Sequence, residues 1–168
     1  MRLIQAFRAI FALAALSFLL FSYNRGDLHP ADKTLLANFT RNEQVFEKLV
    51  EMIRTDKRLL RIDQIWTIPT NPQSVGITEA RILEYRTLLI RLGLSLALYE
   101  FHRPVTIILV AASKDWVRSP PRQGYAYLEM KPNHVVGTLK NYWPKAGKPV
   151  TVYQHIKGNW YIFFDFKD

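Results

Sequence analysis

The sequence predicts an α+β fold in which two amphipathic helices pack on one face of an antiparallel β-sheet, preceded by an N-terminal hydrophobic targeting or anchor helix. Three observations predict this fold. The chain begins with an apolar run, two later segments repeat apolar residues every three or four positions, and most of the remainder alternates apolar and polar residues between short turns. We therefore expect a signal anchor or signal peptide at 1–23, a tether at 24–31 and a single α+β domain at 32–168.

The first segment has the order of charge and hydrophobicity that is typical of a membrane-targeting sequence. Arg2 and Arg8 precede an apolar run at 9–21, after which polar residues resume. A buried helix of a cytosolic protein normally keeps a polar face, and this run has none. We therefore expect residues 9–23 to contact a membrane, with Tyr23 at the interface.

The location of the domain depends on how this segment is processed. The positions after the apolar run lack the pair of small residues that a signal peptidase prefers, which favours an uncleaved anchor over a cleaved signal peptide. The positive charge before the run predicts that the N-terminus stays inside. We expect the domain on the periplasmic, extracytoplasmic side of the inner membrane, or free in the periplasm if the segment is cleaved.

The first helix of the domain is predicted from Asp32, a candidate N-cap, to about Arg54. Glu43, Glu47 and Glu51 share one face of it, which is typical of a solvent-exposed stripe. The opposite face is apolar and is predicted to be buried: Leu35, Phe39, Phe46, Leu49, Val50 and Ile53.

The second helix is predicted between Thr78, a candidate N-cap, and Gly93, which suits a helix C-terminus. Ile77 and Ile82 are spaced as a hydrophobic staple around its first turn. Its predicted inner face consists of Ile82, Tyr85, Leu88, Leu89 and Leu92.

Strand patterns fill most of the remaining domain. A half-buried strand is predicted at 60–68, where alternate residues are apolar, and alternating leucines follow at 94–98. Further strands are predicted at 105–112, 125–129 and 135–139. The clearest pattern is the last, in which 150–156 and 160–166 flank a three-residue turn, Lys157-Gly158-Asn159, and so predict a β-hairpin.

The composition excludes several kinds of chemistry. The chain has no cysteine, which excludes disulfide bonds, thiolate metal sites, a cysteine nucleophile and a lipoprotein anchor. It has 23 Lys and Arg against 14 Asp and Glu, a formal net charge of +9. The excess is concentrated between 103 and 157, where basic residues alternate with tryptophan and tyrosine.

This basic, aromatic region is the candidate binding surface. Expected export argues against nucleic acid, so the candidate partners are an envelope protein, an anionic lipid or an anionic polymer. The loop at 119–124 is the first choice of contact, because recognition is often carried by loops on a rigid sheet. The alternative is a solvated basic surface over an aromatic core. The candidate contact residues are Trp116, Arg118, Arg122, Tyr125, Tyr127, Lys140, Lys145 and Lys148.

The sequence contains no recognisable catalytic motif. It has no nucleophile elbow, S-x-x-K sequence, P-loop or dinucleotide fingerprint, and no histidine has the spacing of a metal ligand. We therefore expect no catalytic residue, no metal and no cofactor. The alternative is an envelope-acting hydrolase whose site is assembled from distant residues such as His102, His134, His155 and Asp115.

Three stretches of the chain carry a resemblance: Phe46-Glu47-Lys48-Leu49-Val50 with Met52-Ile53, Gln123-Gly124-Tyr125-Ala126-Tyr127, and Gly158-Asn159-Trp160-Tyr161. Together they resemble small uncharacterised exported or membrane-anchored proteins of Gram-negative bacteria, over most of residues 35–166. The resemblance implies a hydrophobic start followed by a domain that closes with a hairpin, and it implies no activity.

These observations favour a membrane-tethered or periplasmic, non-enzymatic domain that binds a protein partner in the cell envelope, as an accessory or immunity-like factor does. The expected export and the basic, aromatic region support that function. The two alternatives are the hydrolase described above and a binder of anionic lipid or polymer.

Overall fold

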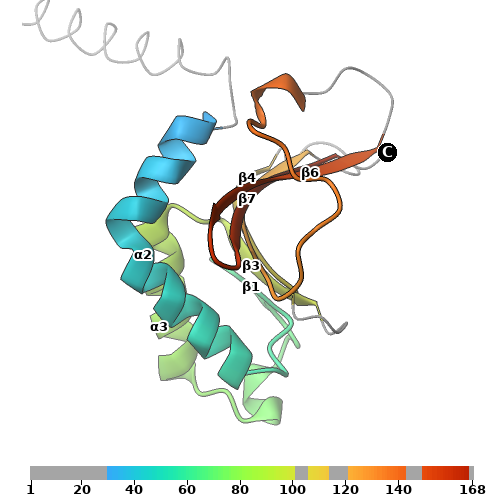
Figure 1. The fold of residues 1–168 in the computed structure, drawn as a ribbon. Coiled ribbons are helices and arrows are strands. Elements are labelled where there is room, and N and C mark those ends of the chain that lie inside the picture. The colour runs from blue at the N-terminus through green and yellow to red at the C-terminus, as the bar shows by residue number, and fades with distance from the viewer. Residues whose placement is uncertain (1–29, 101–105, 114–120, 143–148, 167–168) are drawn as a thin grey trace, which may run out of the picture.

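The computed structural model describes residues 30–100, 106–113, 121–142 and 149–166. Within them two α-helices lie against one face of a seven-stranded antiparallel sheet, which confirms the predicted α+β architecture (Figure 1). The predicted targeting helix at 1–23 lies outside the described residues. Of the helices that are described, none has the length and hydrophobicity needed to cross a membrane.

The first helix, α2 (Asp32–Thr55), buries the apolar face that its periodicity predicts. Its N-cap is Ala31 and not Asp32. The Asp32 carboxylate instead accepts hydrogen bonds from Thr138 Oγ1 at 2.6 Å and from the backbone N–H of Leu139 at 2.7 Å. The start of α2 is therefore hydrogen-bonded to a loop that is distant in the sequence. The local sequence around Asp32 does not predict this contact.

The second helix, α3 (Glu79–Leu92), begins and ends as predicted. Thr78 Oγ1 accepts from the backbone N–H of Arg81, and Gly93 closes the helix in the left-handed conformation with a φ of 66°. A left-handed residue at this position is most easily glycine, because glycine has no Cβ to clash with the helix. All five residues of the predicted inner face are buried.

The sheet has the strand order β2-β1-β3-β4-β5-β7-β6. Its strands are β1 (Arg61–Asp63), β2 (Thr67–Ile68), β3 (Leu96–Glu100), β4 (Thr106–Ser113), β5 (Arg122–Leu128), β6 (Val150–Lys157) and β7 (Trp160–Phe166). Two short 3₁₀ helices, η1 (Pro72–Val75) and η2 (Lys140–Tyr142), lie in the connections. The last strand in chain order, β7, is inserted between β5 and β6.

Two of the predicted strands were wrong in detail. The segment 60–68 is a tight antiparallel hairpin of β1 and β2, so its alternation does not continue through the turn, and Trp66 and Ile68 are exposed. The segment 135–139 makes only one isolated bridge, between Val135 and Tyr153. The predicted hairpin near the end is confirmed as β6–β7, with a positive φ at Gly158.

Apolar residues line both faces of the sheet. The larger cluster lies under α2 and α3, and aromatic rings join these layers: Phe46 stacks 4.5 Å from Tyr125 and 5.6 Å from Trp160, measured between ring centroids. The opposite face carries a smaller cluster that includes Val110 and Phe163. This second cluster explains why the strands are apolar at nearly every position, as in a sheet that is covered on both sides.

Gly124 lies where β5 passes a β-bulge in β4, between Val110 and Ala112. A Cβ added to Gly124 would overlap the carbonyl oxygen of Leu109 and lie 2.8 Å from the backbone nitrogen of Ala111. Of the loop predicted at 119–124, Arg122 to Gly124 belong to a paired strand, and residues 119 and 120 lie outside the described residues. The glycine permits a close approach of two backbones and does not provide a flexible hinge.

Candidate functional site

The predicted contact residues that the structure describes do not form one exposed surface. Tyr125 is fully buried in the core, and Tyr127 packs edge-on against Trp160. Arg122 forms an ion pair with the buried Asp165, whereas Lys140 is exposed at η2. The remaining four candidates lie outside the described residues: Trp116, Arg118, Lys145 and Lys148.

Arg122 joins two central strands through a buried carboxylate. Its Nε and Nη2 atoms both donate to Asp165 Oδ2, with 3.0 Å for Nε, and Thr151 Oγ1 donates to the other carboxylate oxygen at 2.7 Å. Asp165 is on β7, between Arg122 on β5 and Thr151 on β6. The arginine therefore stabilises the sheet and its charge is already neutralised.

Tyr125 and Asn38 connect the sheet to both helices. The Tyr125 hydroxyl donates to the Leu35 carbonyl oxygen at 3.0 Å and accepts from Asn38 Nδ2 at 3.1 Å. The same Asn38 nitrogen donates to the carbonyl oxygen of Leu92 at 2.9 Å. Asn42 donates back to Asn38 at a kink in α2. This network provides a hydrogen-bond donor for the Leu92 carbonyl oxygen at the end of α3.

Burial changes how two tyrosines titrate. Burial raises the pKa of Tyr125 to about 12. Burial, and then the nearby Asp56 carboxylate that accepts from its hydroxyl at 2.9 Å, raise the pKa of Tyr85 still further. In both cases the fold stabilises the protonated form relative to the unfolded chain, where tyrosine ionises near pH 10.

We therefore expect the two tyrosines to make their full contribution to the free energy of unfolding below pH 10. That contribution should be lost as the pH rises from 10 through 12. The unfolded chain ionises both tyrosines in this range while the native protein keeps them protonated, and Tyr125 alone contributes a loss of about 2 kcal/mol. Urea unfolding at a series of pH values measures this decline in the free energy of unfolding. The Tyr125→Phe variant should show a shallower decline, and an equally steep decline would contradict the assignment.

The glutamate stripe of α2 faces the β6–β7 hairpin and not only solvent. Glu43 pairs with Lys157 at 2.6 Å, and Glu47 accepts from Trp160 Nε1 at 2.7 Å. Sequence spacing predicts a solvated stripe, and Glu47 and Glu51 are indeed exposed, but the contacts of Glu43 and Glu47 with the hairpin are not predicted by it. The two carboxylates hold the hairpin against the helix.

The histidines do not form a site among the described residues. His134 and His155 are exposed, and His155 Nε2 lies 3.0 Å from the Gly158 carbonyl oxygen. His102 and Asp115 lie outside the described residues. In the part of the chain that the structure describes, no group of three or more His, Cys, Asp or Glu could hold a metal ion.

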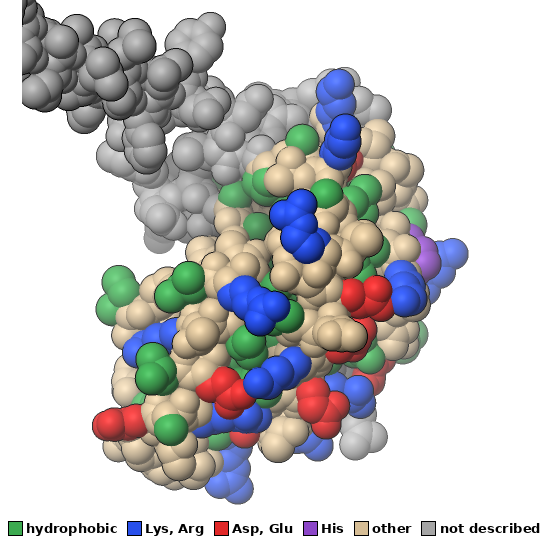
Figure 2. All heavy atoms as spheres, turned by 90° about the vertical axis from the view of Figure 1, so that its left-hand side faces the viewer, with side chains coloured by type: hydrophobic (Ala, Val, Ile, Leu, Met, Phe, Trp, Pro, Cys, Tyr) green, Lys and Arg blue, Asp and Glu red, His purple; other side chains and the backbone are tan. Residues whose placement is uncertain are grey.

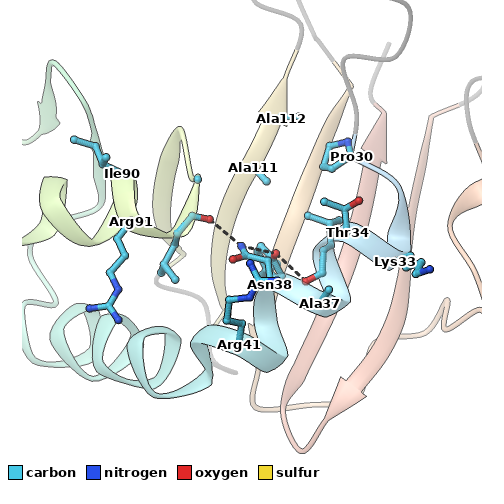
Figure 3. Close-up of a pocket in the computed structure, with 14 residues that line it drawn as sticks. Pro30, Lys33, Thr34, Ala37, Asn38, Arg41, Ile90, Arg91, Ala111 and Ala112 are labelled. Atoms are coloured by element: carbon cyan, nitrogen blue, oxygen red, sulfur yellow. Dashed lines mark hydrogen bonds between the residues drawn. The ribbon is translucent and has the colours of Figure 1, made fainter. Parts of the chain in front are cut away.

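A cavity of about 770 Å³ lies between the first half of α2, the end of α3 and the bulged part of β4. Figure 3 shows Asn38 at its centre, Ala111 and Ala112 behind it on β4, and Pro30 on one side. We call it the Asn38 cavity. It is open to solvent and lies beside the first residues of α2. Figure 1 shows that α2 begins at one end of the domain.

The charges around the Asn38 cavity have one sign. Among the described residues, Lys33, Arg41 and Arg91 line it, and no Asp or Glu does. All three cations are exposed and have no acidic partner among the described residues. From the helix side, Figure 2 shows Lys and Arg over most of this face, whereas most Asp and Glu lie in its lower half.

A second hollow, of about 460 Å³, lies near the other end of the two helices. Three residues around it expose large apolar side chains: Ile65 is 85% exposed, Trp66 43% and Leu83 67%. We call these three residues the Ile65–Leu83 surface. Apolar side chains that gather in this way on a folded domain commonly mark an interaction site.

Polar contacts fix the shape of the Ile65–Leu83 surface. The Asp63 carboxylate accepts from the backbone N–H groups of Ile65 and Trp66, each at 2.8 Å. Arg86 on α3 donates to the Ile65 carbonyl oxygen at 2.8 Å, and the Arg61 guanidinium lies 4.0 Å from the centre of the Trp66 ring. The turn is therefore held in one conformation with its apolar side chains outward.

The sequence contains signals for this surface that its periodicity alone does not reveal. Leu83 and Ile90 lie seven residues apart on the second helix, away from its buried stripe. Apolar residues on the polar face of an amphipathic helix indicate a second contact surface. Of these two residues, Leu83 lies at the Ile65–Leu83 surface, whereas Ile90 lines the Asn38 cavity, the rest of which is assembled from elements that are distant in sequence. No protein-family model, curated protein or solved structure matches this chain.

Proposed function

We propose that this chain is a membrane-tethered, non-enzymatic domain that binds a protein partner in the cell envelope through the Ile65–Leu83 surface. The observation that carries the proposal is the exposure of Ile65, Trp66 and Leu83 around one hollow, on a turn that polar contacts already hold in place. A preformed surface binds with a smaller loss of conformational entropy than a flexible loop.

The partner is a protein that offers an apolar side chain to the hollow and carboxylates around it. Lys57 and Arg58 precede β1 and have no acidic partner among the described residues. The backbone N–H of Leu60 donates to the Ile68 carbonyl oxygen, so this part of the chain runs beside β2. These two cations favour acidic groups on the partner, although the hollow itself is lined by Glu79 as well as Arg86. The tryptophan provides most of the binding energy.

The tether supplies the location of the proposed partner. An apolar run at 9–21 that stays in the membrane keeps the domain at the membrane surface. Helix α2 spans about 36 Å, since its 24 residues each rise about 1.5 Å. The Ile65–Leu83 surface then lies at the end of the domain away from the tether, where it can reach a partner.

Photocrosslinking tests the proposal in cells that carry the full chain. A benzoylphenylalanine at Ile65 or Leu83 should crosslink to one discrete protein, and the same group at the exposed Thr40 should not. Trp66→Ala should lower the yield at least tenfold without changing the melting temperature. Equal crosslinking from all three positions, or none from Ile65 and Leu83, would overturn the proposal.

The second helix offers a matched pair of variants for binding. Leu83 and Ile90 are on the same helix and are 67% and 68% exposed. Leu83→Asp should abolish the crosslink from Ile65, because it introduces a charge into the apolar hollow. Ile90→Asp should leave the crosslink unchanged, and equal loss from both variants would show that the effect is not specific to this surface.

A further inference from the structure

We propose that the Asn38 cavity binds the phosphate headgroup of an anionic phospholipid in the membrane to which the chain is tethered. The inference adds a second binding site, at the end of the domain opposite the Ile65–Leu83 surface, and it rests on the membrane tether of the proposed function. Three observations carry it: the cavity itself, the sign of the charges around it and its position along the chain.

The charges around the cavity select for an anion. Lys33, Arg41 and Arg91 each have a long, exposed side chain that can turn toward a group at the opening. Most other basic side chains on the two helices already bind another group of the protein. Lys48 forms an ion pair with Glu84, and Arg81 forms one with Asp56. Three cations around one opening would attract an anionic group that is placed there.

The floor of the cavity suits the part of a lipid that adjoins its phosphate. Ala37, Ala111 and Ala112 leave an open, weakly apolar floor, and Leu92 contributes to the wall. The carbonyl oxygen of Leu92, at the negative end of α3, is hydrogen-bonded to Asn38. Because that carbonyl is satisfied, it presents less negative charge to an anion in the cavity. A glycerol backbone can therefore lie over the floor while the phosphate meets the cations.

The position along the chain identifies the source of the phosphate. Pro30 lines the cavity and is the ninth residue after Phe21, the last residue of the apolar run. Nine residues span at most about 30 Å when fully extended. If the run is in the bilayer, the cavity cannot lie farther than this from the membrane surface, where anionic headgroups are concentrated. A lipid is therefore the phosphate source that the geometry favours.

The test uses the full chain in micelles of a non-ionic detergent, with two soluble lipids and one free ion as probes. Dihexanoylphosphatidylglycerol should bind, whereas dihexanoylphosphatidylcholine and inorganic phosphate should bind at least tenfold more weakly. A triple variant with Lys33→Glu, Arg41→Glu and Arg91→Glu should weaken phosphatidylglycerol binding at least tenfold. Thermal unfolding and native mass spectrometry both report the bound lipid.

A control variant has the same change in charge at other sites. Lys57→Glu, Arg58→Glu and Lys131→Glu alter three exposed cations that also have no acidic partner among the described residues. This control should bind phosphatidylglycerol normally. Equal weakening in both variants would show a net-charge effect and would overturn the inference, as would inorganic phosphate binding as tightly as the lipid.

The two proposals can fail separately. The cavity variant should keep the crosslink from Ile65, because the Ile65–Leu83 surface shares no lining residue with the Asn38 cavity. If the glutamate variant does not fold, the triple glutamine variant, which removes charge without reversing it, gives the same comparison. Normal lipid binding by a folded glutamine variant would overturn the site, whatever the outcome of the crosslinking.

Discussion

Gly124→Ala is expected to lower the free energy of unfolding by about 3 kcal/mol or more. The new methyl group would overlap the Leu109 carbonyl oxygen and lie 2.8 Å from the Ala111 nitrogen. Both are backbone atoms of β4, so relief requires the two strands to separate and their hydrogen bonds to stretch. Chemical denaturation monitored by tryptophan fluorescence measures the loss.

Gly137 provides the matched control for this substitution. A Cβ at Gly137 would have no heavy atom within 4 Å, and its φ is not in the left-handed region. Gly137→Ala should therefore change stability by less than about 0.5 kcal/mol. Similar losses from the two variants would mean that the close approach of β4 and β5 is not what makes glycine necessary at position 124.

Asp165→Ala is expected to be the second most damaging change, at about 3 kcal/mol. The Asp165 side chain is nearly fully buried, and its removal leaves Arg122 without its carboxylate and Thr151 without its acceptor. Breaking a buried pair by removing one partner costs more than the pair contributes, because the remaining charge stays desolvated. Arg122 is about a quarter exposed, which keeps the loss below the upper end of that range.

Two further variants separate the parts of this network. Thr151→Val removes one hydrogen bond and should lower the free energy of unfolding by about 1 kcal/mol. Glu43→Gln breaks the pair with Lys157, which is exposed, and should leave the melting temperature nearly unchanged. A result in which Asp165→Ala is as mild as Glu43→Gln would show that the buried carboxylate does not hold the three strands together.

The fold was largely predictable because its helices and its last hairpin carry local signals. Thr78 and Gly93 mark the ends of α3 by their own chemistry, and the two-strand pattern around Gly158 defines a hairpin without reference to the rest of the chain. The segment 60–68 was less predictable. A turn stabilised by the Asp63 side chain interrupts an alternation that looks continuous in the sequence.

The candidate sites were less predictable than the fold. Tyr125 was selected because it lies among basic residues, but its ring packs under α2, and sequence cannot distinguish a buried tyrosine from an exposed one in a strand that is apolar on both faces. Lys33, Arg41 and Arg91 are unremarkable in the sequence. They become a group only because the end of α3 returns to the beginning of α2.

The insertion of β7 between β5 and β6 fixes the order in which the domain can be completed. Neither β5 nor β6 gains its partner on that side until the residues of β7, 160–166, have left the ribosome. Until then β6 cannot join the sheet, and Asp165 is not present to bind Arg122 on β5 and Thr151 on β6. The attachment of β6 to the rest of the sheet therefore depends on a strand that follows it in the chain.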